Sequence, residues 1–360
     1  MTSAKNHTVE FQGVNVIPIE VQAHLSNSFA KFKVVGLGDK TVSEAKERVR
    51  AAIASIGIGI PAQRITINLS PADILKEGSH YDLAITLALL EAMNIINKGY
   101  FLNHIICGEL SLDANILPIS GILPTALYCS ENKKTLLCSD KNSNEALWAN
   151  KNLDILSTDK LINIIKHSKQ VITITRPQYK PPKYRSRKDK VNFNEINGHK
   201  FAKRALEIAA AGRHNLLMIG PAGSGKSMLA KAFPSIFPNL SPAEILENSI
   251  ISSISKSSGN ETMQYEIPFR APHHSASHIA ISGGGKKAQP GEVSLANNGI
   301  LFLDELPEFN KTTLETLRQP MEDGEITIAR ADNHITYPAK FILIAAMNPC
   351  RCGNLNEDSG

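Results

Sequence analysis

The spacing of apolar and polar positions in the first half of the chain predicts a sheet combined with helices. Several short segments alternate with the period of a β-strand or form short apolar runs. These strand candidates are Val14–Val21, Phe32–Leu37, Arg64–Leu69, Ile105–Leu110 and Thr135–Cys138. Apolar residues recur at helical spacing in Ser43–Ile56, and Tyr81–Met93 is apolar almost throughout, as expected of a buried helix. We therefore expect one unit of mixed helices and strands over residues 8–168.

The second half has a different pattern, in which short apolar runs alternate with helical segments. Leu216–Ile219, Gly299–Leu303 and Phe341–Ala346 are each short enough for a buried strand. Lys200–Ala211 is helical, and another helix is expected from Ser241, which is followed by Pro242 and, three residues after the cap, by Glu244. Alternation of this kind favours an α/β domain with a parallel sheet over residues 193–360.

Residues 169–192 between the two patterns predict a linker. Within them, Arg176–Lys190 contains Pro177, Pro181 and Pro182 together with seven basic residues and one acidic residue. This composition resists packing into a core. It is compatible with a solvated tether, and also with an arm that contacts phosphates and stacks bases on Tyr179 and Tyr184.

Composition narrows the class of protein only slightly. The chain has 360 residues, of which 42% are hydrophobic and 20% charged, which is ordinary for a globular protein of two domains. No run of apolar residues is long enough for a membrane span, and the polar N-terminus lacks the apolar segment of a signal peptide. Five cysteines without a regular framework favour a reducing cytoplasm, and a net charge of +5 permits nucleic-acid binding without arguing for it.

The segment Gly220–Ser227 carries the most specific chemical signal. It reads Gly-Pro-Ala-Gly-Ser-Gly-Lys-Ser and fits the phosphate-binding loop G-x-x-x-x-G-K-[ST], with a strand before it and a helix after it. Glycines let backbone N–H groups surround phosphates at the N-terminus of the helix. Lys226 would reach the β- and γ-phosphates of ATP, and the Ser227 hydroxyl would bind Mg²⁺. The expected nucleotide-binding residues are Gly220, Pro221, Ala222, Gly223, Ser224, Gly225, Lys226, Ser227 and Met228.

Polar residues at the ends of the two later strands complete this prediction. Asp304 would bind Mg²⁺ directly or through water, and Glu305 would orient and deprotonate the attacking water. Asn348, which follows the third strand, would contact the γ-phosphate or that water; it could also be an ordinary turn residue before Pro349. Because parallel strands end at one edge of a sheet, these side chains are expected to meet there.

The phosphate loop, Gly299–Phe309, Phe269–Ser277 and Ala346–Cys350 together resemble the magnesium-chelatase-like AAA+ ATPases, in particular their ComM/YifB group. The resemblance runs from about Val14 to Gly353. It implies an ATP-dependent hexameric DNA helicase that acts in branch migration and natural transformation, with ATP and Mg²⁺ bound between subunits. It also implies that the N-terminal unit is similar to the proteolytic domain of Lon and to domain 2 of ribosomal protein S5.

The resemblance further places DNA-contacting loops on this sequence. An inserted segment maps to Pro268–Pro290, with a mobile basic loop around Lys286 and Lys287. A β-hairpin maps to Glu325–Tyr337, with Arg330 near its turn. These three basic residues are candidates for sequence-independent phosphate contacts, although they could equally be solvated surface charge. His273 and His274 have no apparent third metal ligand and are expected to serve in a polar loop.

Two departures from the family qualify these expectations. The Lon nucleophile corresponds to His80, neighbouring Ser79 is displaced by one position, and Ser120–Thr125 lacks the catalytic lysine, so no protease activity is expected. The sequence to Gly360 also lacks the arginine finger and helical lid of the family. We therefore expect a truncated chain that binds nucleotide weakly and hydrolyses it slowly, if at all.

Other interpretations stay open at this stage. The chain could be an ATPase subunit of a metal-inserting chelatase, an ATP-dependent protease, or a remnant that binds nucleotide without turnover. Cys350 and Cys352 have no partner cysteines with which to close a zinc site, so no metal beyond Mg²⁺ is expected.

Overall fold

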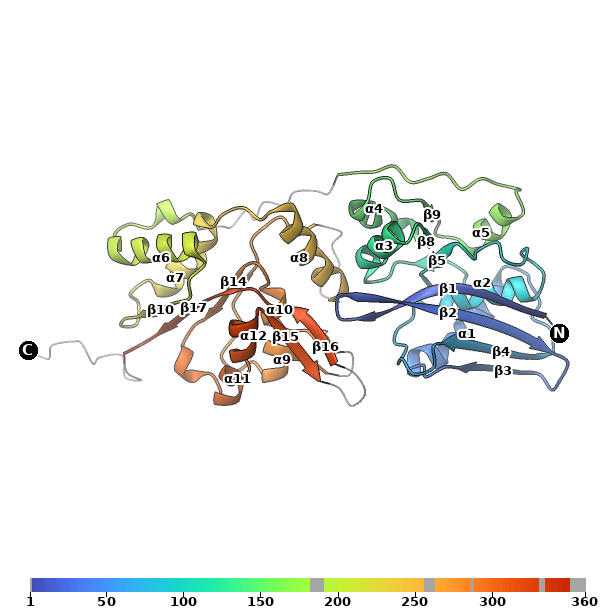
Figure 1. Cartoon of the computed structure of the whole chain (residues 1–360), viewed down its shortest axis with the longest axis horizontal. Coiled ribbons are helices and arrows are strands. Elements are labelled where there is room, and N and C mark those ends of the chain that lie inside the picture. The colour runs from blue at the N-terminus through green and yellow to red at the C-terminus, as the bar shows by residue number, and fades with distance from the viewer. Residues whose placement is uncertain (1, 182–190, 256–262, 286–287, 330–333, 350–360) are drawn as a thin grey trace, which may run out of the picture. The chain divides into compact units, whose positions relative to one another are not determined.

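The computed structural model describes residues 2–181, 191–255, 263–285, 288–329 and 334–349. The chain divides into two compact units, Met1–Pro182 and Lys183–Gly360, called unit 1 and unit 2 below. Each unit has its own sheet and its own hydrophobic core (Figure 1). Within the described residues, none of the helices is both long and apolar enough to cross a membrane.

Unit 1 is built on a seven-stranded mixed sheet with the strand order β3-β4-β2-β1-β5-β8-β9. Pairing is antiparallel in β1–β2 and β2–β4 and parallel in the other four pairs. The strands of this sheet are β1 Thr2–Gln12, β2 Asn15–Ser26, β3 Lys31–Val35, β4 Arg64–Ser70, β5 His104–Ile106, β8 Thr135–Cys138 and β9 Ile155–Ser157. A separate small ladder joins β6 Glu109–Leu110 to β7 Ile116–Leu117.

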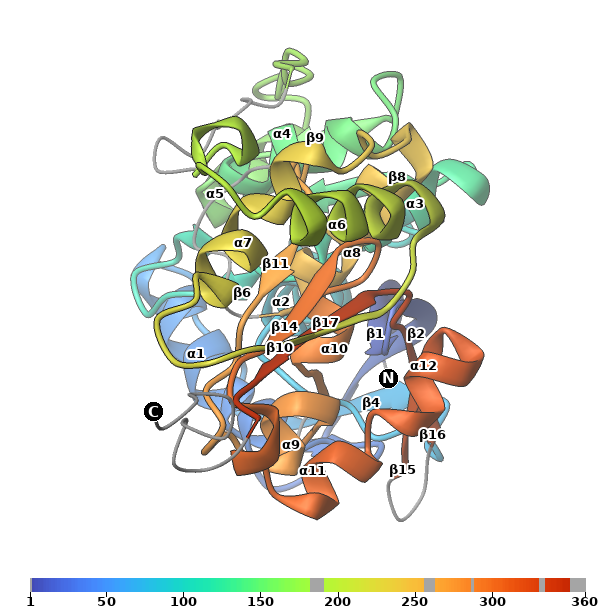
Figure 2. The ribbon, with the colours of Figure 1, turned by 90° about the vertical axis from the view of Figure 1, so that its left-hand side faces the viewer.

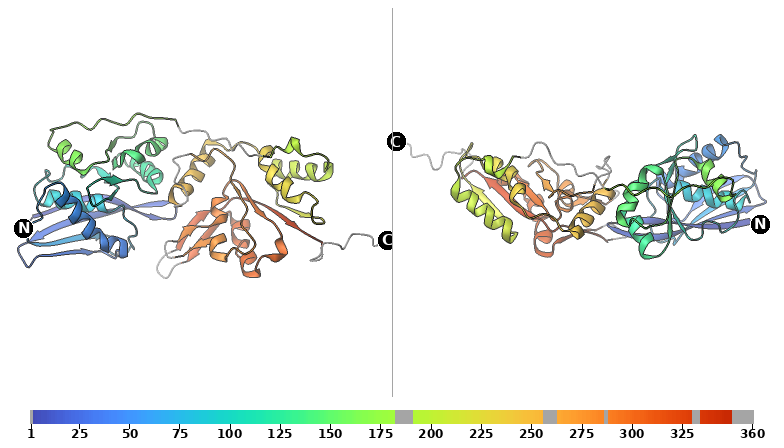
Figure 3. Two further views of the ribbon diagram at one scale, coloured as in Figure 1. Left: turned by 180° about the vertical axis from the view of Figure 1, so that it is seen from behind. Right: turned by 90° about the horizontal axis from the view of Figure 1, so that it is seen from above.

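The helices of unit 1 pack on its sheet according to their apolar positions. They are α1 Lys40–Ser55, α2 Asp82–Ala92, α3 Ile122–Glu131, α4 Asp140–Ala149 and α5 Leu161–Ser168. Every residue of α2 is buried, which confirms the expected buried helix. In Figure 1 the strands β1–β4 face the viewer with α1 and α2 behind them, and Figure 3 shows the same layers from behind and from above. One face of this part of the sheet is thus covered by helices.

Strand β1 is the main element that the sequence pattern did not predict. Its inward positions include Asn6, Thr8 and Glu10, all of which are buried. Polar side chains on the buried face of a strand remove the apolar alternation by which strands are recognised. The structure therefore begins the sheet at Thr2, before the expected first strand.

Unit 2 contains a four-stranded parallel sheet with the order β10-β17-β14-β11. Its strands are β10 Leu216–Ile219, β11 Phe269–Arg270, β14 Ile300–Leu303 and β17 Ile342–Met347. All four residues of β14 are buried, as a parallel strand covered on both faces requires. The expected strands and their parallel arrangement are thus confirmed.

Helices flank this sheet, and two hairpins extend from the unit. The helices are α6 Lys200–Gly212, α7 Lys226–Ala232, α8 Pro242–Ile254, α9 His278–Ser282, α10 Glu292–Leu295, α11 Lys311–Glu315 and α12 Arg318–Asp323; 3₁₀ turns are η1 Phe193–Glu195, η2 Phe233–Ile236 and η3 Leu306–Glu308. The hairpins pair β12 Gly283–Gly284 with β13 Gln289–Pro290, and β15 Glu325–Ala329 with β16 His334–Pro338. Figure 2 shows α6 and α7 on one side of the strands and α9, α11 and α12 on the other.

The start of α8 follows the sequence signal closely. The Ser241 side chain accepts a hydrogen bond from Glu244 N, and the Glu244 carboxylate accepts one from Ser241 N. This reciprocal capping box, with Pro242 at the first helical position, satisfies backbone N–H groups that the helix leaves free.

Candidate nucleotide-binding site

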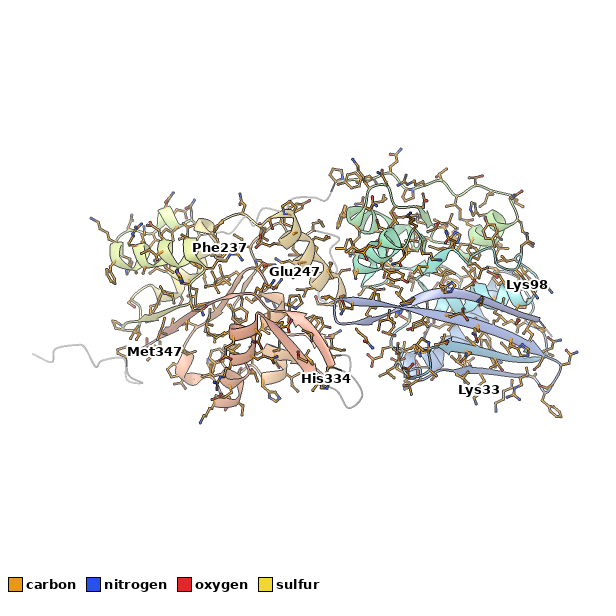
Figure 4. The ribbon with its side chains drawn as sticks, in the orientation of Figure 1. Lys33, Lys98, Phe237, Glu247, His334 and Met347 are labelled. Atoms are coloured by element: carbon orange, nitrogen blue, oxygen red, sulfur yellow. The ribbon has the colours of Figure 1, made fainter. Side chains whose placement is uncertain are left out.

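The loop between β10 and α7 turns sharply at the C-terminal end of the parallel strands. The Gly220 N–H donates to Met347 O at 3.3 Å, so the pairing of β10 with β17 continues to the start of the loop. Met347 marks this strand end in Figure 4. Gly223 and Gly225 have φ angles of +76° and +80°, values that favour glycine. A Cβ atom at Gly225 would also lie 3.3 Å from Nε2 of His199.

The side chain of Lys226 folds back into this loop. Its ammonium donates to Gly220 O at 2.7 Å, Pro221 O at 2.8 Å, Ser224 Oγ at 3.3 Å and Asn348 Oδ1 at 3.1 Å. All four acceptors are neutral, so the positive charge is not offset by these contacts and is suited to an anion. The loop therefore carries a positive charge where its backbone turns.

Ser227 and Asp304 lie next to each other in the same region. The Ser227 hydroxyl donates to Asp304 Oδ2 at 2.6 Å, and Asp304 Oδ1 accepts from Glu305 N at 3.1 Å. A hydroxyl and a carboxylate are hard oxygen ligands of the kind that bind Mg²⁺ together with water and phosphate oxygens. These two residues fit a Mg²⁺ ion bound with a nucleotide.

Glu305 contacts a residue from a different element. It has a φ angle of +53°, its side chain is 58% exposed, and its Oε2 lies 3.4 Å from Nδ1 of His274. The His274 ring lies 4.0 Å from that of His273, centroid to centroid. No spacing in the sequence predicts this contact, because His274 follows β11 whereas Glu305 follows β14.

The segment that carries His274 is anchored by an ion pair. Arg270, at the end of β11, donates to both carboxylate oxygens of Glu292 at 2.6 and 2.7 Å. These hydrogen bonds raise the pKa of Arg270 above its ordinary value. Since Glu292 begins α10, the pair connects β11 to the segment that directly follows the β12–β13 hairpin.

A polar cluster fixes the approach to β14. Asn297 and Asn298 are buried, and their amide nitrogens donate to the Glu247 carboxylate at 2.9 and 2.6 Å. Both amides also donate to Asn248 Oδ1. Glu247 lies on α8, as Figure 4 shows, so α8 is tied to the strand that delivers Asp304 and Glu305. No motif or spacing in the sequence indicates this cluster, because Glu247 and Asn297 lie 50 residues apart along the chain.

Several expected site residues lie outside the described residues. They are Lys286, Lys287, Arg330, Cys350 and Cys352. Across the part of the chain that the structure describes, no group of three or more His, Cys, Asp or Glu side chains could hold a metal ion.

Comparison with known proteins identifies relatives along nearly the whole chain. The family "Magnesium chelatase, subunit ChlI" matches residues 192–360, and "Subunit ChlI of Mg-chelatase" matches residues 21–142. "Competence protein ComM" of Haemophilus influenzae is 40% identical over 346 residues, which cover 95% of this chain and 68% of that protein. "Uncharacterized protein YifB" of Escherichia coli is 41% identical over 348 residues, 97% of this chain and 68% of that protein. "Magnesium-chelatase subunit ChlI" of Euglena gracilis is 26% identical over 156 residues, 37% of this chain and 45% of that protein.

Proposed function

The chain belongs to the ComM/YifB group of magnesium-chelatase-like AAA+ ATPases, and from this premise we propose that unit 2 binds ATP with Mg²⁺ and couples its hydrolysis to movement of DNA. The DNA would be branched or single-stranded and bound without regard to sequence, and the active form would be a hexamer of this chain in the cytoplasm. The role proposed is branch migration during recombination and uptake of DNA.

The convergence of three strand ends carries the nucleotide part of this proposal. Lys226 follows the loop after β10, Asp304 follows β14 and Asn348 follows β17, yet Lys226 contacts Asn348, and Ser227 contacts Asp304. In open parallel sheets, ligands bind at the carboxyl ends of the strands. A phosphate chain would be bound there by the loop N–H groups and Lys226.

Each residue then has a definite task in hydrolysis. Mg²⁺, held by Ser227 and Asp304, would neutralise charge on the phosphates. The Glu305 side chain is exposed to water, and its carboxylate would accept a proton from the water molecule that attacks the γ-phosphate. Asn348 would position the γ-phosphate or that water, since its amide already lies beside the Lys226 ammonium.

The two hairpins support the DNA part of the proposal. Tyr337 in β16 donates its hydroxyl hydrogen to Ala288 O at 2.9 Å, beside β13. Ile328 in β15 packs closely on Gly283 in β12. Both hairpins are thus anchored to one another. Lys286, Lys287 and Arg330 lie in the sequence between the paired strands, and we propose them as phosphate contacts.

The steady-state rate of ATP hydrolysis, with and without forked DNA, tests the proposed function. We expect turnover that requires Lys226 and rises with DNA; the control for the nucleotide site is Lys226→Ala. The combined variant Lys286→Ala, Lys287→Ala and Arg330→Ala should lose most of the DNA stimulation and keep the basal rate. Lys231→Ala, Lys311→Ala and Arg318→Ala, which neutralise three exposed charges of unit 2, serve as its matched control. Turnover that is equal in wild type and Lys226→Ala would contradict the proposal.

The chelatase-type matches favour one alternative, an ATPase subunit that acts with a metal-inserting partner. Stimulation of hydrolysis by such a partner and a porphyrin, but not by DNA, would select it. A remnant that binds nucleotide without hydrolysing it would show neither stimulation but would still lose nucleotide affinity in Lys226→Ala.

We also propose that unit 1 has no protease activity and serves assembly or partner binding. Ser79 donates its hydroxyl hydrogen to Glu109, and the Lys76 ammonium donates to Pro71 O. A Ser–Lys pair needs the two groups within hydrogen-bond reach of each other, and these contacts direct both groups elsewhere. A casein digest that showed cleavage by the purified chain would contradict this assignment.

A further inference from the structure

One face of the unit 1 sheet is open over β3, β4 and the adjoining ends of β1 and β2, whereas Val9 on the same face of β1 is buried with residues of α3. The open part carries an excess of basic side chains. Strand register places the same-face residues of four strands together, since successive side chains alternate between faces. This open face comprises Ser3, Lys5, His7, Glu20, Gln22, His24, Ser26, Arg64, Thr66, Asn68, Ser70, Lys31, Lys33 and Val35. The opposite face of the same strands packs on α1 and α2 (Figures 1 and 3).

The charge on this face is not balanced within it. Its one carboxylate, Glu20, is already engaged by Lys5 at 3.3 Å and by the amide of Gln22 at 2.6 Å. Lys31, Lys33 and Arg64 are exposed, and none of them forms an ion pair with a carboxylate among the described residues. Three uncompensated cations therefore remain at the β3–β4 side of the face.

The placement of these cations opposes folding stability. Lys31 and Arg64 are direct cross-strand partners in the parallel β3–β4 ladder. Like charges directly opposite one another destabilise a sheet. An anionic ligand over this face would offset that repulsion, whereas no carboxylate among the described residues of unit 1 pairs with either side chain.

An exposed aromatic ring adds a second, independent feature beside the same strands. Phe29 lies in the turn between β2 and β3 and is 95% exposed, more than any other large apolar side chain described. The turn is held by a hydrogen bond from Gln63 Nε2 to Asn27 Oδ1 at 2.7 Å. A solvent-facing ring next to basic residues is suited to stacking on a base.

We propose that the open face and Phe29 form a binding site for single-stranded DNA. Lys31, Lys33 and Arg64 would contact phosphates, while amide and hydroxyl side chains such as Gln22, Asn68 and Thr66 would hydrogen-bond the backbone. Phe29 would stack on an unpaired base, which a duplex does not present, and this favours a single strand. The site is made of unit 1 residues alone, whereas the hairpins belong to unit 2; only the choice of DNA over RNA rests on the function proposed above.

Fluorescence anisotropy of a labelled oligothymidylate of about 30 nucleotides, titrated with the 360-residue chain at several salt concentrations, tests the site. The combined variant Lys31→Glu, Lys33→Glu and Arg64→Glu should weaken binding at least about 10-fold. It should also lower the magnitude of the salt slope by about 2, because each single-strand phosphate contact contributes about 0.7. The matched control is Lys98→Glu, Lys151→Glu and Lys169→Glu, which makes the same charge change at other exposed positions; Figure 4 labels Lys33 and Lys98.

Stacking is tested separately from charge. Phe29→Ala should weaken binding at least about 5-fold, and Phe29→Tyr, which keeps a ring, should restore it. All of these variants change exposed side chains and should melt like the wild type. Equal loss in the two charge-reversed triples, an unchanged affinity in Phe29→Ala, or no binding of oligothymidylate at all would each overturn the site. Tighter binding of oligouridylate than of oligothymidylate would overturn the choice of DNA.

A nucleotide measurement on the same proteins separates this inference from the proposed function. The Lys31→Glu, Lys33→Glu and Arg64→Glu variant should bind a fluorescent ATP analogue as the wild type does, because Lys226 is unchanged. Lys226-dependent nucleotide binding without single-stranded DNA binding would refute the site and leave the nucleotide part of the proposed function standing. DNA binding that requires the open face, in a chain that binds no nucleotide, would support the site and refute the nucleotide part of the proposed function.

Discussion

Two aspartates, one in each unit, differ in how completely their charge is satisfied. Asp82 in unit 1 is fully buried and accepts hydrogen bonds from Arg48 Nε at 2.6 Å, Arg48 Nη2 at 2.9 Å and Leu110 N at 3.3 Å. Asp304 in unit 2 lies at a strand end and accepts from the Ser227 hydroxyl and from Glu305 N.

The difference distinguishes a carboxylate that stabilises the fold from one that is available to bind a metal ion. Both oxygens of the Asp82 carboxylate accept hydrogen bonds, from the Arg48 guanidinium and from Leu110 N. The pair therefore connects α1 to α2, and its carboxylate is not available to bind a ligand. The hydrogen bonds that Arg48 donates to Asp82 raise the pKa of Arg48, whereas burial raises the pKa of Asp82 from 3.8 to about 6, so the pair is ionised at neutral pH. Within the described part of the chain, Asp304 accepts hydrogen bonds only from neutral groups, and a metal ion can replace the hydrogen bond from Ser227. Neutralising Asp82 should therefore lower the stability of unit 1, whereas neutralising Asp304 should lower Mg²⁺ binding and ATP hydrolysis by unit 2.

The largest effect is expected from Glu305→Gln. Loss of a general base costs about 10²- to 10⁴-fold in rate, whereas the amide keeps the size of the side chain. Single-turnover hydrolysis and analogue binding should be measured together, with Glu315→Gln as a control on an exposed carboxylate of the same unit. Unchanged turnover in Glu305→Gln would remove Glu305 from the mechanism, and a matching loss of nucleotide affinity would make its role one of binding.

The next largest effect is expected from Asp82→Asn, which should lower the free energy of unfolding and leave the rate of hydrolysis unchanged. Breaking a buried ion pair on one side costs about 3–5 kcal/mol of unfolding free energy. The exposed pair Arg204–Glu207 provides the contrast, because Glu207→Gln should cost less than about 1 kcal/mol. Urea unfolding measures both, and nucleotide binding should stay unchanged in each folded variant. A cost for Asp82→Asn no larger than that for Glu207→Gln would contradict the structural role of the pair.

A smaller, pH-dependent effect is expected at Glu10. Burial raises the pKa of this carboxyl from 4.5 to about 7, although it accepts a hydrogen bond from the Tyr81 hydroxyl. Because the folded state holds the proton more tightly, the stability of unit 1 should fall as the pH rises from about 4.5 to about 7, by at most about 3 kcal/mol, and then level off.

Glu10→Gln, which cannot ionise, should flatten that part of the stability curve. Thermal melts from pH 4 to pH 8 would measure the difference between the two proteins. A wild-type curve that rises over this window, or a variant curve that falls as steeply as the wild type, would show that Glu10 does not retain its proton in the fold.

The smallest effect is expected from Ser241→Ala at the start of α8. Loss of the cap costs about 1 kcal/mol. Since α8 is tied through Glu247 to Asn297 and Asn298, a larger loss of nucleotide affinity than of stability would show that α8 positions the site. Equal affinity would limit the role of Ser241 to capping. Both are measured on one preparation by urea unfolding and analogue titration.

The sequence predicted those parts of the fold in which local chemistry and tertiary structure agree. The glycine-rich loop, β14 with its terminal carboxylates and the capping box of α8 each have a short-range signal that packing does not overrule. The family was predicted correctly from the glycine-rich loop together with Gly299–Phe309, Phe269–Ser277 and Ala346–Cys350. Strand β1 was missed because its buried face is polar, which no periodicity analysis detects.

Contacts between distant segments could not be predicted in the same way. The pairs His274–Glu305 and Arg270–Glu292 join elements that are far apart in the sequence. The pair Arg48–Asp82 joins α1 to α2. Spacing within one element has no bearing on such contacts. The open face of unit 1 likewise emerges only once strand order and register place β3 beside β4.

The most direct test of the central claim is a titration of the chain with a fluorescent ATP analogue in the presence of Mg²⁺. We predict saturable binding that weakens at least about 10-fold in Lys226→Ala, as expected for loss of a charged hydrogen-bond donor to phosphate. Lys231→Ala, in the same helix, should bind as the wild type does. Equal affinity in the wild type and Lys226→Ala would contradict the assignment of this loop as the nucleotide-binding site.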